Sequence, residues 1–166
     1  MQTHYNYVFD SITSSFVFTT KNDFLYRVAF INDEIFSTIS NEEIPNIFQI
    51  VIEKANDEIE PLDNKVSNTV ENIIEQFFTK KENSLIYICY DLDQKANVRF
   101  DVFERWYKKS TLKNNIIKID KIIEIDLKGL EKQKLYTAFM FHKKNSNHKK
   151  LIEIYSRIED VLNREK

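Results

Sequence analysis

The sequence predicts an α+β fold, with three helices and a mostly antiparallel sheet of about six to seven strands in one compact domain spanning residues 1–166. Three observations support this fold. Short segments alternate apolar and polar residues, which is typical of half-buried strands. Longer segments repeat apolar residues at three- and four-residue spacing, as amphipathic helices do. Hairpin-like strands alternate with helices along the chain, an order that predicts helices covering one face of the sheet.

Aromatic residues alternate with polar ones in the first predicted strands, which span residues 5–10, 15–20 and 24–31. Turn-forming residues at 21–23 separate the second strand from the third. These strands therefore predict an antiparallel hairpin or meander.

A polar segment and the first helix follow. Residues 32–45 predict a loop with a helical turn, and residues 46–55 alternate again and predict a further strand. Apolar residues then recur at helical spacing, which predicts a helix over about residues 63–80. Asp63 is the expected N-cap of this helix.

The segment Ser84–Tyr90 is almost entirely apolar, so we place it centrally in the sheet. It contains Cys89, the one cysteine of the chain, which we interpret as an inert core residue. Residues 91–95 then predict a turn, and a second helix follows over about 97–110. The apolar face of this helix is expected to contain Val98, Val102, Phe103 and Trp106.

The C-terminal third predicts a hairpin and a helix. Residues 115–127 alternate isoleucine with charged side chains, and residues 134–142 form the expected partner strand. Lys128-Gly129 supplies the turn between them. Apolar residues at helical spacing predict a last helix over about 147–165.

The scarcity of glycine, cysteine and histidine excludes several kinds of functional site. Gly129 is the only glycine, so the glycine-rich signatures of dinucleotide folds, phosphate loops and hydrolase elbows are absent, and we predict no cofactor. One cysteine and three scattered histidines give no zinc-ligand spacing, and no local signature indicates a catalytic centre. The apolar runs are too short to cross a bilayer, and the N-terminus lacks signal-peptide features, so we expect a cytoplasmic protein.

The segment after the central strand combines charges and aromatic rings most densely. Asp91 and Asp93 could bind a divalent cation at the end of this strand, and Arg99 and Arg105 could bind an anion. A metal- or phosphate-dependent enzyme centred on Asp91, Asp93 and Arg99 is therefore one alternative function. A plain turn and a solvated helix face are the stronger interpretation, with Trp106 in the core rather than in a stacking site.

Charge is unevenly distributed along the chain. Residues 1–63 carry 3 Lys or Arg against 11 Asp or Glu, whereas residues 95–150 carry 15 against 6. The basic stretch, which includes Lys108 and Lys109, suggests a weak nucleic-acid binder as a second alternative. It contains no helix-turn-helix, RRM or zinc-finger signature, so an ordinary lysine-rich surface is the stronger interpretation.

The leading prediction is a non-enzymatic protein-interaction module. Aromatic strands with a free edge and the polarised charge favour binding to another protein or self-association as a homodimer. An accessory, toxin-neutralising or defence-related setting is the expectation that accompanies it.

The stretch YICYDLDQKANVRFDVFERWY resembles a family of small uncharacterised Bacteroidota proteins, over nearly the full length of the chain. The most specific part of the resemblance is an Arg-x-x-x-Phe-x-Arg-Trp-Tyr pattern formed by Arg99, Phe103, Arg105, Trp106 and Tyr107. Relatives tend to carry glycine in the turn where this chain has Gln94-Lys95. The resemblance implies the fold and a bacterial source and implies no activity.

Overall fold

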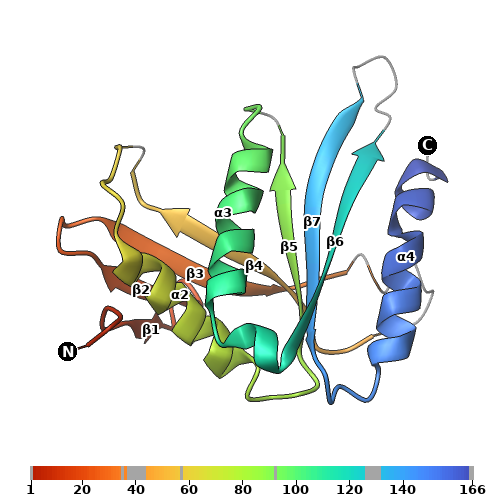
Figure 1. Ribbon diagram of the computed structural model, residues 1–166, viewed down its shortest axis with the longest axis horizontal. Coiled ribbons are helices and arrows are strands. Elements are labelled where there is room, and N and C mark those ends of the chain that lie inside the picture. The colour runs from red at the N-terminus through yellow and green to blue at the C-terminus, as the bar shows by residue number, and fades with distance from the viewer. Residues whose placement is uncertain are drawn as a thin grey trace.

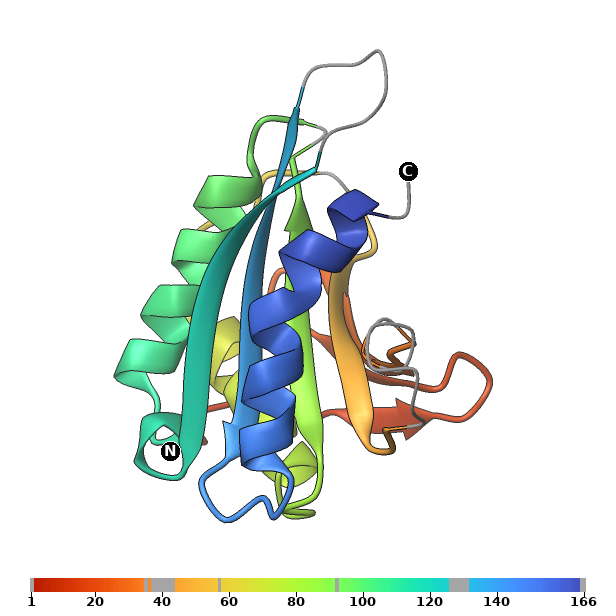
Figure 2. The same cartoon turned by 90° about the vertical axis from the view of Figure 1, so that its right-hand side faces the viewer.

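The computed structural model places one twisted sheet in the middle of the molecule, with helices on both of its faces (Figures 1 and 2). The structure describes residues 2–34, 36, 44–56, 58–91, 93–125 and 132–164. Within them lie the strands β1 (Val8–Asp10), β2 (Ser15–Thr19), β3 (Leu25–Asn32), β4 (Ile47–Lys54), β5 (Ser84–Tyr90), β6 (Ile116–Ile125) and β7 (Gln133–His142), the helices α2 (Asn64–Phe77), α3 (Ala96–Lys109) and α4 (His148–Arg164), and the 3₁₀ turn Leu112–Asn114. The predicted α+β class, with a seven-stranded sheet and three helices in this part of the chain, is confirmed.

The strands lie in the order β1-β2-β3-β4-β5-β7-β6, and all neighbours are antiparallel except β4 and β5. In that parallel pair, Ile47 lies opposite Ser84 and Gln49 opposite Ile86. Parallel neighbours require a crossover connection, and α2 is the helix of this crossover. None of the described helices is both long enough and apolar enough to span a membrane.

Helices cover both faces of the sheet, so the expectation of one covered face is wrong. Leu85 and Met140 belong to a core beneath α2 and α3, which we call the α2/α3 core. Ile86 and Phe139 belong to a second core beneath α4. Successive residues of a strand point to opposite faces, and β5 and β7 are apolar at both sets of positions. Each face therefore needs its own helical cover, which Figure 2 shows with α3 and α4 on opposite sides of the strands.

The first strand is shorter than its sequence pattern predicts. The hydroxyl group of Tyr7 donates to Asn72 Oδ1 at 2.7 Å, and the backbone N–H of Tyr5 donates to Thr69 Oγ1 at 2.9 Å. Both acceptors belong to α2. The alternating tyrosines before Val8 therefore anchor the chain to a helix instead of extending the sheet.

Helix α2 begins where the sequence predicts. Asp63 adopts an extended conformation, and its Oδ1 accepts the backbone N–H of Lys65 at 2.9 Å, which confirms it as the N-cap. Cys89 is buried and forms no disulfide, and burial raises the pKa of its thiol. Most of the loop predicted at 32–45 and the turn predicted at Lys128-Gly129 lie outside the described residues.

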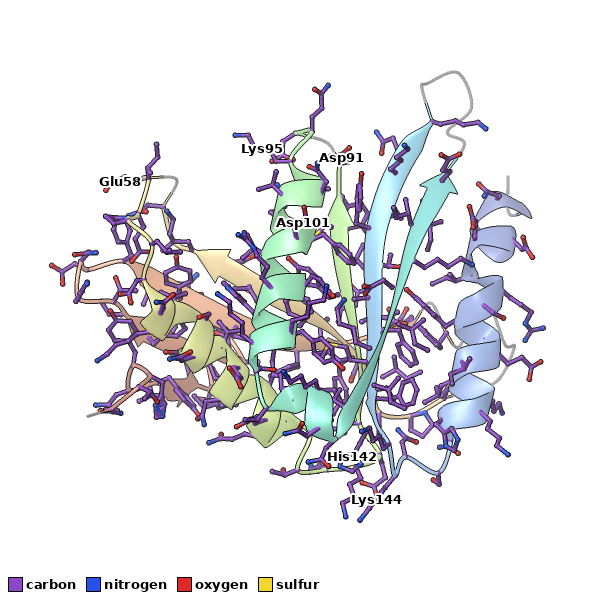
Figure 3. All side chains as sticks on the ribbon, in the orientation of Figure 1. Glu58, Asp91, Lys95, Asp101, His142 and Lys144 are labelled. Atoms are coloured by element: carbon purple, nitrogen blue, oxygen red, sulfur yellow. The ribbon has the colours of Figure 1, made fainter. Side chains whose placement is uncertain are left out.

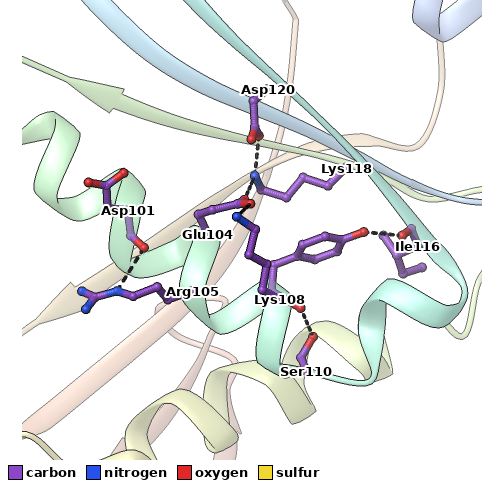
Figure 4. A network of polar contacts seen from close by, with 9 residues as sticks. Asp101, Glu104, Arg105, Lys108, Ser110, Ile116, Lys118 and Asp120 are labelled. Carbon is purple, nitrogen blue, oxygen red and sulfur yellow. Dashed lines mark hydrogen bonds and ion pairs between the residues drawn. The ribbon is translucent and has the colours of Figure 1, made fainter.

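A buried lysine joins α3 to β6 (Figure 4). The side chain of Lys118 is 2% exposed, and its ammonium group pairs with the carboxylates of Glu104 and Asp120. It also lies 5.2 Å from the ring centre of Phe100 and 5.7 Å from that of Tyr107. Partial burial opposes the ionisation of Glu104, but hydrogen bonds from Lys118 and Lys108 lower the pKa of its carboxyl group overall. The cluster adds charged contacts between α3 and β6 to the packing of the helix on the sheet.

We expect the loss of the two carboxylates that pair with Lys118 to destabilise the fold more than the loss of the lysine itself. The double change Glu104→Gln and Asp120→Asn leaves a buried cation without a counter-charge, and should lower the free energy of unfolding by about 3 kcal/mol. Lys118→Met keeps the volume and leaves two partly exposed carboxylates, and should cost less than about 1 kcal/mol. Urea denaturation measures both, and equal losses would contradict this account.

Candidate functional site

The predicted carboxylates close the turn between β5 and α3. Asp91 Oδ1 accepts the backbone N–H of Ala96 at 3.1 Å, and Asp93 Oδ1 accepts that of Lys95 at 3.2 Å. Figure 3 shows Asp91 and Lys95 together at the end of α3 beside the C-terminal end of β5. These aspartates therefore satisfy backbone donors that the start of a helix leaves free.

Arg99 completes this turn. Its Nη1 lies 2.6 Å from Asp93 Oδ2, and its Nη2 donates to the backbone oxygen of Tyr90 at 2.8 Å. The hydrogen bond from Arg99 lowers the pKa of the Asp93 carboxyl group. The structure thus brings Asp91, Asp93 and Arg99 together as predicted, with each engaged inside the turn. The described residues contain no group of three or more His, Cys, Asp or Glu side chains that could hold a metal ion.

A second group of predicted residues lines a groove of about 660 Å³. One wall is α3, which contributes Arg105, Trp106 and Lys109, and the other is formed by α2 and the segment that leads into it. We call this the α2/α3 groove. Its volume is within the range of ordinary binding sites, and three of the residues predicted from the sequence meet in it.

The apolar residues of α3 lie in two environments. This corrects the expectation that they form one face buried in the core. Phe103 is buried in the α2/α3 core as expected, whereas Val98 is 56% exposed. Val102 and Trp106 are half-buried and line the groove. Within the described part of the chain, the indole N–H of Trp106 makes no hydrogen bond. Trp106 thus packs against the α2/α3 core and also lines the groove.

The opposite wall contains residues that the sequence did not indicate. The hydroxyl group of Tyr26 donates to Glu60 Oε2 at 2.7 Å, and burial together with this bond raises the pKa of Tyr26. Glu60 Oε1 is also buried and has no hydrogen-bond partner among the described residues. Leu62 lines the same wall and is 95% exposed. The only local signal was the run Glu-Ile-Glu-Pro-Leu-Asp, in which Ile59 and Leu62 belong to no helical or strand periodicity.

The lysines of the basic stretch are dispersed, and several of them are engaged with other groups of the chain. Lys95 lies at one end of the sheet and Lys144 at the other (Figure 3). Lys108 Nζ lies 3.1 Å from Glu104 Oε1, and Lys113 Nζ donates to the backbone oxygen of Lys108 at 2.8 Å. The basic stretch therefore reaches both ends of the sheet, and part of its positive charge is paired within the chain.

Arg105 makes no ion pair with the carboxylate of Asp101, although the two residues are four positions apart on α3. Its Nε donates instead to the backbone oxygen of Asp101 at 3.3 Å, so its terminal amino groups point away from that side chain (Figure 4). Lys109 has no hydrogen bond or ion pair within the described residues. These two cations of the groove are therefore available to a ligand.

Gln94 gives a test of the turn before α3. Its φ of 57° lies in the left-handed region, where side chains other than glycine are strained. Gln94→Gly should therefore raise the free energy of unfolding by about 0.5 kcal/mol, because relief of strain exceeds the added entropy of the unfolded chain. Lys95→Gly, at a φ of −120°, is the matched control and should be destabilising. A loss of stability with Gln94→Gly in urea denaturation would contradict the turn geometry.

Comparison with known proteins places the chain in a family. No curated protein matches it. Residues 62–157 match a family of unknown function, DUF6169, over a stretch that contains α2 and α3 and ends within α4. The match is shorter than the nearly full-length resemblance expected from the sequence, and the Bacteroidota source and the arginine-tryptophan pattern stay predictions. Because the match covers more than half of its length, the chain belongs to the family of unknown function DUF6169.

Proposed function

We propose that this protein is a non-enzymatic interaction module and that a partner protein binds in the α2/α3 groove. The observation that carries the proposal is the exposure of two large apolar side chains beside the groove. Leu62 is 95% exposed and Ile59 is 97% exposed, one on each side of Glu60 and Pro61. Burying both would remove substantial apolar surface from water, which favours association.

The α3 wall supports the same proposal. Trp106 and Arg105 are of the residue types that most often dominate the binding energy of protein interfaces. Val98, one turn beyond the groove, extends the apolar surface with a side chain that is 56% exposed. The α3 wall thus adds an aromatic ring, an arginine and an exposed apolar side chain to the exposed apolar side chains of the opposite wall.

The alternative functions have less support. Asp91, Asp93 and Arg99 are engaged in the turn before α3 and do not line the groove, which weakens the case for an enzyme. The dispersal of the lysines weakens the case for nucleic-acid binding. Another protein and a second copy of this chain both remain compatible with the groove, and an accessory, toxin-neutralising or defence-related role remains part of the proposal.

Site-specific photo-crosslinking tests the proposal. A benzophenone side chain at position 62 should crosslink a partner in cells that express the chain natively, and Trp106→Ala should abolish that product by removing the facing contact. Position 12 is the matched control, because Ile12 is 93% exposed but lies in the turn between β1 and β2. The proposal fails if both positions give the same products, or if Trp106→Ala has no effect on a chain that is still folded.

A further inference from the structure

We propose that the segment that occupies the α2/α3 groove is acidic; this inference rests on the proposed function and specifies the partner's chemistry. The first argument is the hydrogen-bonding capacity of α3. The terminal amino groups of Arg105 and the ammonium group of Lys109 have no partner in the described part of the chain. Being four residues apart, they are neighbours on the helix surface. A carboxylate between them would gain charge-assisted hydrogen bonds, including a bidentate pair with the guanidinium.

The second argument comes from the opposite wall. Its acidic groups accept hydrogen bonds from the chain itself: Asp63 from Tyr5 and from Lys65, and Glu71 from the backbone N–H of Thr111 at 3.0 Å. Their negative charge would repel a ligand with dense charge along its length, such as a nucleic acid. A protein segment with single carboxylates can place them against α3 and away from this wall.

Glu60 does not pair with these cations within the described residues. One of its carboxylate oxygens accepts the hydroxyl group of Tyr26, and the other is buried within the chain. The two cations of α3 are therefore left for a carboxylate of the partner.

Selection from a phage-displayed library of random short peptides tests this inference on the full chain. The selected peptides should be enriched in Asp and Glu. Binding can be followed by fluorescence, because Trp106 is the only tryptophan and lies in the groove. The double change Arg105→Ala and Lys109→Ala should weaken binding at least about tenfold. The matched control removes two cations from exposed positions of α4, by Lys149→Ala and Arg157→Ala, and should leave the affinity unchanged.

The outcomes separate this inference from the proposed function. Selected peptides without acidic enrichment, whose binding is lost with Leu62→Ser but not with the α3 double change, would overturn the inference and retain the function. Failure to select any peptide that changes Trp106 emission would count against both. A single-stranded oligonucleotide or tripolyphosphate that changes this emission, in the absence of acidic peptide binders, would show that the cations bind phosphate and would also overturn the inference.

Discussion

The parallel pairing of β4 and β5 determines where the groove forms. A tight turn cannot join parallel neighbours, so the chain between Lys54 and Ser84 must cross the sheet. Helix α2 makes this crossing, and the segment leading into it carries Glu60 and Leu62 along one face. Helix α3 follows β5 on the same face, and both helices pack on the α2/α3 core. The groove is the space between the crossover and the next helix, so the connectivity of the sheet creates it.

The strands and helix starts were predictable because their signals are local. The alternation in β3 and the apolar run of β5 reflect the two faces of a strand, and Asp63 caps α2 through a bond to Lys65, two residues away. The helix faces were less predictable. Periodicity groups Val98, Val102 and Trp106 with the buried Phe103, but it does not say which part of the stripe meets the sheet. That depends on how α3 lies beside α2, which no local pattern contains.

The candidate site shows the same limit. Asp91, Asp93 and Arg99 were predicted as a cluster because they lie within nine residues, and they do meet, although as parts of a turn. The contact between Tyr26 and Glu60 joins residues that are 34 positions apart, and no spacing rule brings them together. The sequence also does not show that the terminal amino groups of Arg105 lack a partner among the described residues. Asp101 stands four residues earlier, at the spacing of an ion pair on a helix, but in the structure Arg105 bonds to its backbone oxygen.

Glycine scarcity and internal charge pairing together define what kind of surface this fold can offer. The one glycine lies outside the described residues, and left-handed turn positions within them are taken by residues such as Asn46 and Gln94, so the described turns offer no glycine against which a ligand could lie. Recognition then depends on side chains. Lys118 and Lys108 share the carboxylate of Glu104, so part of the positive charge of the C-terminal half is neutralised within the fold. Arg105 and Lys109, which α3 presents to the groove, are not neutralised in this way, so a carboxylate of an incoming protein segment can pair with them.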